Sequence, residues 1–472
     1  MSVALPKRRS RVASLRFVVI AVLRQWSPVA GLLRRPAAAV VAGFAVAAAI
    51  GTALLMLPGT TETGTAPDFV VAVFTAVSAV CVTGLIVVDT PTYWSTFGEL
   101  MILGLVQAGG IGIMTLATLL GLLIARRMGL RLQLTAQAET RSLGLGEVRH
   151  VLGGVLLISL VIELLVAVPL VARFALFYDE PLGRALYLGG FYGVSSFNNS
   201  GFALFTDSMI PFATDPWICV PVALASITGG IGFPVLFELG RRLRGRTSRW
   251  SLHVRVTVIT YGILVGVGIA AFLMAEWRNP GTIGPIEVGG KLVIGFFHGI
   301  MPRTAGFNSI DVGQLDPSTL LITEVLMFIG GGSAGTAGGI KVTTFALLGF
   351  IMLAEVRGEP TVHVLGRRLP ATVQRQALTV ALSGVGLVMV FTVILLSISD
   401  FGLEVVLFET VAAFSTAGLS TGITDDLSKP AQLVLTALMF LGRLGPITLA
   451  SALALRERGR RYELPEERTI VG

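Results

Sequence analysis

The chain has 472 residues, of which 53% are hydrophobic and only 14% are charged. Because soluble domains carry about 25% charged residues, this composition excludes a soluble protein and indicates one that lies in a membrane. Several apolar runs also exceed the roughly 20 residues that a helix needs to cross the hydrocarbon core of a bilayer.

Lysine and arginine are concentrated in five clusters, which hold 28 of the 36 such residues. The clusters occupy residues 1–35, 126–149, 241–255, 357–375 and 456–468. The positive-inside rule predicts that all five, and therefore both termini, lie in the cytoplasm. Because these charges stand at the ends of apolar runs and not on one face of a soluble domain, we do not expect nucleic acid as a partner.

Between successive basic clusters the chain must cross the membrane an even number of times. Each interval contains a long apolar run, a short one of 13 to 15 residues and another long one. A run of the short length fits a re-entrant segment better than a span. We therefore predict an all-α integral membrane protein with eight transmembrane helices and four re-entrant pore helices, arranged as four pseudo-symmetric helix–pore helix–helix repeats around one central pore. The predicted repeats are 36–127, 150–246, 254–357 and 374–456, between a basic cytoplasmic N-terminal tail (1–35) and a cytoplasmic C-terminal tail (457–472).

The four short runs align with one another without gaps. Each places a Phe ten residues before a Gly, with a small residue before that Gly and Leu or Phe after it. The pairs are Phe74 with Gly84, Phe191 with Gly201, Phe296 with Gly306, and Phe408 with Gly418. Because the glycines follow one another at intervals of 117, 105 and 112 residues, one unit recurs four times.

The residues just before these glycines are predicted to form an ion filter. Irregular backbone at membrane depth is tolerated only where it is buried in protein or lines a water-filled cavity. Four such segments around one axis would replace the hydration shell of a cation with backbone carbonyls, and glycine gives the backbone room there. The alternative is four ordinary extracellular turns. The predicted filter residues are Val80, Cys81, Val82, Thr83, Gly84, Asn198, Asn199, Ser200, Gly201, Arg303, Thr304, Ala305, Gly306, Ser415, Thr416, Ala417 and Gly418.

An acidic residue follows each of the four glycines by five to eight positions. The predicted topology places these carboxylates at the outer mouth, where a ring of them would concentrate cations. Asp is also a routine turn residue, so solvated loop acids are an equal alternative. The residues concerned are Asp89, Asp207, Asp311 and Asp425.

The last span of each unit contains a second repeated motif, which is rich in glycine. In the first two units, Gly109–Gly112 and Gly229–Gly232 are explained by close helix packing. In the third, the stretch IGGGSAGTAGGI beginning at Ile329 is too rich in Gly for a stable helix, and we predict a break that forms a gate below the filter. A simple kink is the alternative. The predicted gate residues are Gly330, Gly331, Gly332, Ser333, Ala334, Gly335, Thr336, Ala337, Gly338, Gly339 and Lys341, with Arg443 of the fourth unit.

Arg443 interrupts an otherwise apolar span. An arginine at the centre of a bilayer costs about 2.5 to 3.5 kcal/mol, so its side chain should face the pore or a buried carboxylate. In the pore it would raise the barrier to permeation of cations and could pair with Glu324 or Glu238 in some states. Structural pairing with an acid is the alternative. Lys341 either lines the inner cavity or snorkels. In the second unit, Glu163 and Arg173 could pair with one another or with partner helices of the protein, and we assign them no role.

With these residues in place, the sequence resembles the Ktr/Trk/HKT superfamily of potassium transporters, most closely its bacterial KtrB-type membrane subunits. The motifs that carry the resemblance are SAVCVTGLIVVDT, LVQAGGIGIMT, SSFNNSGF, PRTAGFNSID, GGGSAGTAGGIKVTT, AAFSTAGLSTGITDDL and LGRLGP. The resemblance implies that Gly84, Gly201, Gly306 and Gly418 are the filter glycines, that residues 330–339 are an intramembrane gating loop and that Arg443 is a pore arginine. Cys81 stands where the family usually has Thr.

The resemblance also implies a homodimer in the bacterial plasma membrane, seated on a cytosolic ring of RCK subunits that bind ATP or ADP. Potassium would be the transported ion and sodium an activator, with no cofactor bound by the chain itself. We therefore expect gated, channel-like potassium uptake. A secondary transporter that couples Na⁺ or H⁺ to K⁺ is the alternative. We do not expect an enzyme, because no catalytic arrangement of residues is apparent in the sequence.

Overall fold

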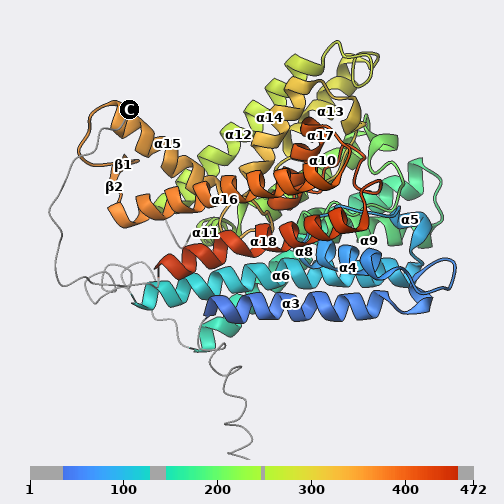
Figure 1. The fold of residues 1–472 in the computed structure, drawn as a ribbon, viewed down its shortest axis with the longest axis horizontal. Helices are drawn as coiled ribbons and strands as arrows, with labels where there is room; N and C mark the ends of the chain where they lie inside the picture. The colour runs from blue at the N-terminus through green and yellow to red at the C-terminus, as the bar shows by residue number, and fades with distance from the viewer. Residues whose placement is uncertain (1–35, 128–144, 246–249, 455–472) are drawn as a thin grey trace, which may run out of the picture.

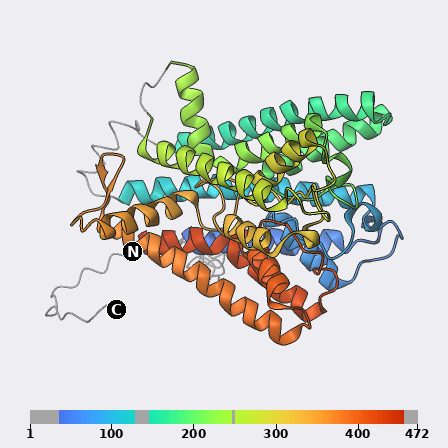
Figure 2. The same ribbon diagram turned by 90° about the horizontal axis from the view of Figure 1, so that it is seen from above.

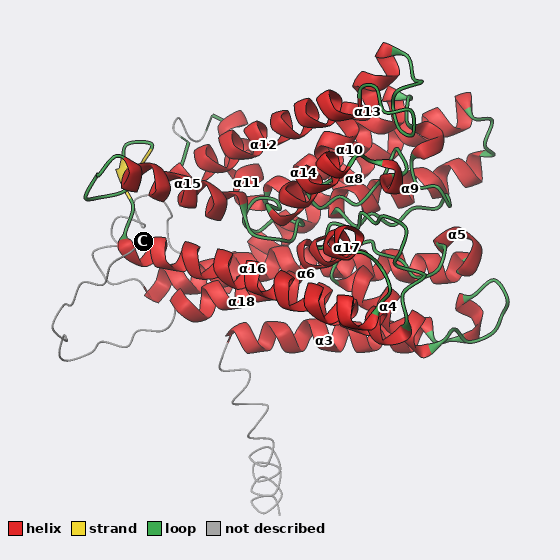
Figure 3. Ribbon diagram, turned by 45° about the horizontal axis from the view of Figure 1, so that its top comes forward, coloured by secondary structure: helices red, strands yellow, loops and turns green. Residues whose placement is uncertain are grey.

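The computed structural model describes residues 36–127, 145–245 and 250–454, and within them regular structure is almost entirely helical (Figures 1 and 3). The all-helical architecture is therefore confirmed. Both predicted tails, residues 1–35 and 457–472, lie outside the described residues. Most of the long helices run roughly along the long axis of the molecule (Figure 1).

The first unit shows how each repeat is built. α3 (Pro36–Leu55) is followed by the short α4 (Phe69–Val80) and the long α6 (Thr96–Arg127). α4 begins where the side chain of Asp68 accepts a hydrogen bond from the backbone N–H of Val70, which caps the helix. Most of α4 is buried between its two longer neighbours, as a re-entrant helix requires.

The same order recurs in the other three units. The second unit contains α8 (Leu145–Phe177), α9 (Leu182–Asn198), α10 (Pro216–Ile231) and α11 (Phe233–Leu243). The third contains α12 (Leu252–Glu276), α13 (Val288–Ile300), α14 (Pro317–Phe328) and α15 (Val342–Val356). The fourth contains α16 (Ala371–Ile398), α17 (Leu403–Ser415) and α18 (Lys429–Ala454). Short elements in the loops are η1 (Pro58–Thr60), α5 (Thr90–Tyr93), η2 (Ile210–Phe212) and η3 (Val312–Gln314).

Length and composition identify the helices that face lipid. Among the described residues, Leu152–Phe177 of α8, all of α12 and all of α16 are long and apolar enough to cross a membrane alone. The pair α10 and α11 qualifies as one bent span. The outer side of α8 exposes large apolar side chains, including Leu157, Leu164 and Leu165. A surface of this kind is stable in lipid and not in water.

The second unit contains a break that the sequence analysis did not predict. We expected an uninterrupted last span in this unit, with glycines that only serve packing, but α10 ends at Ile231 and α11 leaves it at an angle of 101° (Figure 2). Gly232 makes this turn with φ +99°, a conformation that side chains strongly disfavour. Two return spans are therefore interrupted, in the second and third units.

A small hairpin between the third and fourth units was also not predicted. β1 (His363–Val364) and β2 (Arg367–Arg368) pair antiparallel, with His363 opposite Arg368. Leu365 and Gly366 between them both have positive φ, as a two-residue hairpin turn of type I′ requires. The hairpin packs beside α15 (Figure 1), on the side of the molecule where the basic clusters place the cytoplasm.

The repeated glycines of the return helices lie directly against the ends of the pore helices. A Cβ built on any of them would collide with the carbonyl oxygen of the residue four positions before the filter glycine of the same unit. The three cases are Gly109 with Val80, Gly229 with Phe197, and Gly442 with Phe414. Close packing therefore explains the glycine motif of the return helices in three of the four units.

The first and last units meet at the outer end of the bundle. There Lys429, at the start of α18, pairs with Asp68 at the start of α4, with 2.8 Å between Nζ and Oδ2. The hydrogen bond from Lys429 is the main reason that the pKa of Asp68 lies below its usual range. Both side chains are exposed, so the pair marks the closure of the ring of units and adds little stability.

Candidate ion pathway

Three of the four pore helices end in the same hydrogen-bonded turn. After α4, α9 and α17, one residue adopts the left-handed conformation: Val82, Asn199 and Thr416, with φ of 55°, 59° and 50°. The N–H of this residue donates a hydrogen bond to the carbonyl three residues earlier. The N–H of the following residue donates to the carbonyl five residues before it, as Ser200 does to Ser195 at 2.9 Å. This is the Schellman motif, which ends a helix with its last carbonyls satisfied.

In the third unit the same position is strained but the hydrogen bonds differ. Thr304 has φ +73°, yet the N–H of Ala305 bonds to Met301, four residues back, at 3.0 Å. Thr304, Val82 and Thr416 are all β-branched, and such residues rarely adopt positive φ. Strained backbone of this kind is typical of functional sites, where the surroundings hold it in place.

The four filter glycines also share positive φ. The values are 87° for Gly84, 72° for Gly201, 76° for Gly306 and 80° for Gly418. Each unit thus has left-handed backbone at the glycine and again two residues before it. A turn that formed independently in four loops would not repeat this pattern, so the alternative of ordinary extracellular turns loses its support.

The glycines form a closed ring. A Cβ built on each one would fall against the carbonyl oxygen of the residue just before the glycine of the next unit. The four pairs are Gly84 with Ser200, Gly201 with Ala305, Gly306 with Ala417, and Gly418 with Thr83. The order of contacts is therefore 1–2–3–4–1, and four backbone carbonyls meet where the units converge. This is the arrangement that can coordinate a dehydrated cation.

The structure places the four glycines and the residue just before each of them at this ring, and the other predicted filter residues have different roles. The side chains of Thr83, Thr304 and Asn199 have buried polar atoms without a hydrogen-bond partner among the described residues. Asn198 and Arg303 instead direct their side chains away from the ring, to Gln107 and Gly330. Cys81 is fully buried at the end of α4, in the core beside the ring.

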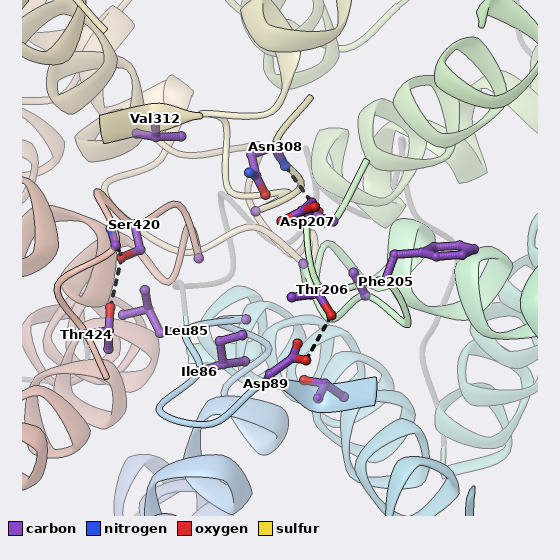
Figure 4. A pocket seen from close by; sticks show the side chains of 18 of the residues that line it. Leu85, Ile86, Asp89, Phe205, Thr206, Asp207, Asn308, Val312, Ser420 and Thr424 are labelled. Carbon is purple, nitrogen blue, oxygen red and sulfur yellow. Dashed lines mark hydrogen bonds between the residues drawn. The ribbon is translucent and has the colours of Figure 1, made fainter. Parts of the chain in front are cut away.

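A vestibule of about 480 Å³ opens outside the ring. Its lining includes all four filter glycines and the four predicted carboxylates, Asp89, Asp207, Asp311 and Asp425. Figure 4 shows side chains from all four units around it. Asp89 accepts hydrogen bonds from Thr92 and Thr206, and Asp311 caps the turn at Gly313. Asp207 and Asp425 are exposed, and their carboxylates make no hydrogen bond within the described part of the chain.

Neutralising Asp207 and Asp425 should test the attraction of cations by the vestibule without disturbing its loops. We expect the double variant Asp207→Asn, Asp425→Asn to take up rubidium more slowly at low ionic strength, by about two- to fivefold, and to match the wild type at high salt. Glu62→Gln, at an exposed acid outside the vestibule, is the control. A deficit that persists at high salt would contradict an electrostatic role.

The Gly-rich segment lies on the opposite side of the ring from the vestibule. α14 ends at Phe328 and α15 begins at Val342, so the helix is interrupted over residues 329–341, somewhat longer than the predicted gate segment 330–339. Its glycines pack on the interrupted end of α10, where Gly332 and Thr336 donate hydrogen bonds to the carbonyls of Gly230 and Gly229 at 2.8 and 3.1 Å. A Cβ on Gly338 would collide with the carbonyl of Ser415, at the end of the fourth pore helix. In this conformation the segment is fixed below the ring.

Arg443 reaches this segment from α18. Its guanidinium donates to the carbonyl of Thr336 and, at 3.4 Å, to the hydroxyl of Thr416. The side chain is 2% exposed and forms no ion pair with a carboxylate among the described residues. The alternative of structural pairing with an acid is therefore wrong for this conformation, and neither Glu324 nor Glu238 is a partner here. Lys341 turns inward too, and its Nζ donates to the carbonyl of Ala337 at 2.5 Å.

Two buried carboxylates near the ring have partners that the sequence analysis did not identify. Glu163 does not pair with Arg173; it accepts 2.9 and 3.2 Å hydrogen bonds from Gln107, which in turn accepts one from Asn198 at the end of α9. Arg173 pairs with Asp215 at 2.7 Å. No spacing in the sequence predicts these partners, because they lie on different helices.

The second is Glu409 of α17, which sequence reasoning passed over. It is 1% exposed and accepts hydrogen bonds from Ser420, Thr421 and Thr424, all in the segment that follows Gly418. One carboxylate therefore holds the outer end of the fourth filter segment against its own pore helix. The unusual feature that could have revealed it is a charged residue within an apolar pore helix.

Replacing Glu409 by Leu should leave the hydrogen-bond donors of Ser420, Thr421 and Thr424 without their acceptor. Each such group costs about 1 to 3 kcal/mol, so the midpoint of thermal unfolding in detergent should fall by several degrees, with a smaller fall for Glu409→Gln. Glu404→Leu, at an exposed position of the same helix, should have little effect. If Glu409→Leu unfolds at the wild-type temperature, the carboxylate does not hold this segment.

Comparison with known proteins assigns the family. A family model described as cation transport protein, TrkH, matches residues 32–460. The Ktr system potassium uptake protein B of Bacillus subtilis (strain 168) is 36% identical over 91% of this chain and 95% of its own. The potassium/sodium uptake protein NtpJ of Enterococcus hirae is 32% identical over 93% of this chain and 97% of its own. The potassium transporter TrkH from Vibrio parahaemolyticus has the same fold, with a TM-score of 0.69 at 18% identity over 87% of this chain and 82% of its own. The chain therefore belongs to the TrkH family of membrane cation transport proteins.

Proposed function

We propose that this protein conducts potassium into the cell through the carbonyl ring, as a gated and channel-like pathway. The observation that carries the proposal is the cyclic contact of the four filter glycines, because each glycine faces the carbonyl of the next unit. Such a ring substitutes for the hydration shell of a monovalent cation. The vestibule with four carboxylates supplies cations from outside.

Potassium is the proposed ion because all four units keep glycine at the ring. The names of similar proteins also support it, since relatives of Bacillus subtilis and Vibrio alginolyticus are called potassium uptake proteins. Another relative is called a potassium/sodium uptake protein. Sodium as an activator, which the family resemblance implies, also belongs to the proposal. Cys81 offers its backbone to the pathway, so its thiol leaves the ring's chemistry unchanged.

The segment 330–339 and Arg443 are proposed to form the gate, in a closed state. The segment fills the space under the ring, and a buried guanidinium without a counter-ion repels cations there. Opening would require the segment to leave Gly229 and Gly230. Lys341 adds a second cation at the same level.

The assembly proposed for the chain is a homodimer in the bacterial plasma membrane, with both termini in the cytoplasm. A cytosolic ring of RCK subunits would bind ATP or ADP and move the gate. The distribution of basic clusters supports this orientation. The hairpin of β1 and β2 and the end of α15 lie at the proposed cytoplasmic side, where such a ring would contact the chain.

A coupled transporter of K⁺ with Na⁺ or H⁺ is the second candidate, and one observation favours it. Glu163 is a buried carboxylate linked through Gln107 to Asn198 at the filter. Ionisable groups at membrane depth often carry protons or ions. In a channel, the reversal potential follows the potassium gradient alone; in a coupled transporter it also shifts with sodium or pH.

Growth of a potassium-uptake-deficient bacterium tests the proposal. Expression of the chain with an RCK partner should restore growth at low potassium and give rubidium uptake, whereas the chain with Gly306→Leu should give neither. Gly349→Leu, at a helical glycine where an added Cβ would have no atom within 4 Å, is the matched control and should rescue. Failure of both the wild type and the control would contradict the proposal.

A further inference from the structure

Arg303 is the second buried guanidinium near the ring, and the pathway described above gives its side chain no task. It lies three residues before Gly306, in the third filter segment, and is 1% exposed. Its Nη2 donates to the carbonyl of Gly330 at 2.5 Å, and its guanidinium lies 4.4 Å from the centre of the Tyr261 ring. Among the described residues it forms no ion pair with a carboxylate.

A buried arginine with one hydrogen bond and no counter-ion is costly to keep. Its Nε and Nη1 have no partner in the described part of the chain. Leucine or methionine would fill the same space without this cost. Stability therefore does not explain why an arginine occupies this position. Its one hydrogen bond suggests the reason, because the acceptor, Gly330, is the first residue of the candidate gate.

The two guanidiniums hold the gate from opposite ends. Arg303 holds Gly330, where the segment leaves α14, and Arg443 holds Thr336 in the second half. Ile329 and Ile340 are bridged to one another, so the two ends of the segment are joined. Arg443 comes from a return helix, whereas Arg303 is part of the filter backbone itself.

The third filter segment also differs from the other three in its own hydrogen bonds. It lacks the Schellman pattern of the others, and Ala305 bonds four residues back instead of five. Thr304 has the largest positive φ of the four equivalent residues, 73°. The one segment with a different backbone is thus the one that is attached to the gate.

We propose that Arg303 is a positioning residue that couples the gate to the filter. While it holds Gly330, the segment stays below the ring and the third filter segment keeps its distinct backbone. When the segment moves, the hydrogen bond breaks, and Thr304 to Gly306 relax. Opening of the gate therefore changes the selectivity of the ring. This inference rests on the proposed function only for its flux readout.

The movement of the gate can be measured without any flux. Ala337→Cys places a thiol at a loop position that is 1% exposed, so a small, charged, membrane-impermeant thiol reagent reaches it only when the segment moves. Labelling of the purified full chain in liposomes should be roughly tenfold faster with Arg303→Met than without it, because a charge-assisted hydrogen bond is lost. The chain without Ala337→Cys gives the background of the two native cysteines, both buried.

The selectivity of the filter provides the second readout. Arg303→Met should lower the preference for potassium over sodium by roughly fivefold, and Arg303→Lys should lie between it and the wild type. Tyr261→Leu, which removes the ring under the guanidinium, should act in the same direction, whereas Tyr261→Phe should not. Arg278→Met, at an exposed arginine of the same unit, is the matched control and should match the wild type.

The outcomes separate the inference from the proposed function. Faster labelling with altered selectivity supports the coupling. Unchanged labelling and selectivity in folded Arg303→Met overturn it, and if that variant does not fold, the same result in Tyr261→Leu overturns it. Faster labelling with unchanged selectivity also overturns it, because Arg303 would then hold the gate alone. Absence of rubidium flux in the wild type would instead contradict the proposed function.

Discussion

Gly84→Ser is expected to lower the preference for potassium over sodium by about tenfold, which corresponds to about 1.4 kcal/mol in relative binding. Gly84 has φ +87°, and a Cβ at this position would collide with the carbonyl oxygen of Ser200. That oxygen belongs to the ring, so the substitution moves one of the proposed ligands and widens or distorts the site. Competition between rubidium and sodium for uptake into liposomes measures the effect.

The control for this prediction is Gly64→Ser. Gly64 also has positive φ, +69°, but a Cβ added there would have no atom within 4 Å. The two variants therefore share the backbone strain and differ in the collision with the ring. We expect Gly64→Ser to keep the wild-type ion preference. If Gly84→Ser discriminates between the ions as the wild type does, the ring does not select them.

Arg443→Ala is expected to raise flux by roughly tenfold in the absence of any activating partner. The substitution removes the hydrogen bond that holds Thr336 below the ring and also removes a buried positive charge from the pathway. Both changes favour permeation of a cation. The initial rate of rubidium uptake into liposomes that contain only this chain measures the effect.

Two further variants test whether the increase in flux comes from the gate. Deletion of residues 333–336 should raise flux in the same way, because it shortens the segment that fills the space below the ring. Arg375→Ala, at an exposed arginine on α16, should behave as the wild type. A folded Arg443→Ala protein with slower uptake would show that the arginine serves the architecture and not the gate.

Much of the architecture could be predicted because it follows from repetition and periodicity. Apolar length identifies spans, and a fourfold repeat of Phe and Gly at fixed spacing places the pore helices before any contact is known. The filter glycines could be predicted for the same reason. Only backbones that converge need glycine at the same place in four units, and the four positive φ angles are the structural counterpart of that pattern.

The break at Gly232 has a local and a tertiary cause. Gly229–Gly232 has the same sequence as Gly109–Gly112, yet α6 continues through its copy and α10 ends. Pro234 follows in the second unit only; it has no backbone N–H and its ring clashes with the carbonyl four residues back, so a helix is kinked or broken there. The Gly-rich segment of the third unit also donates hydrogen bonds to the carbonyls of Gly229 and Gly230 and accepts one from Phe233. These tertiary contacts could not be predicted from the sequence, whereas the effect of the proline could.

Side-chain partners at membrane depth were also beyond prediction. The sequence shows that Arg443 and Glu163 need partners but not which ones, since every candidate is far away along the chain. Arg443 and Arg303 each donate a hydrogen bond to a backbone carbonyl, and carbonyls of the main chain have no sequence signature. Gln107 was overlooked because its partners, Glu163 and Asn198, lie far away along the chain. Glu409 is different, because a charged residue within an apolar pore helix is visible in the sequence.

The central claim is that potassium crosses through the ring without an obligatory coupled ion, and the reversal potential tests it most directly. The purified full chain carrying Arg443→Ala would be reconstituted into a planar bilayer, so that no partner is needed for opening. We predict that the reversal potential follows the potassium gradient by about 59 mV per tenfold change and does not move when the gradient of sodium or of pH is changed. A reversal potential that shifts with either gradient, or a current that shows no preference for potassium, would contradict the account.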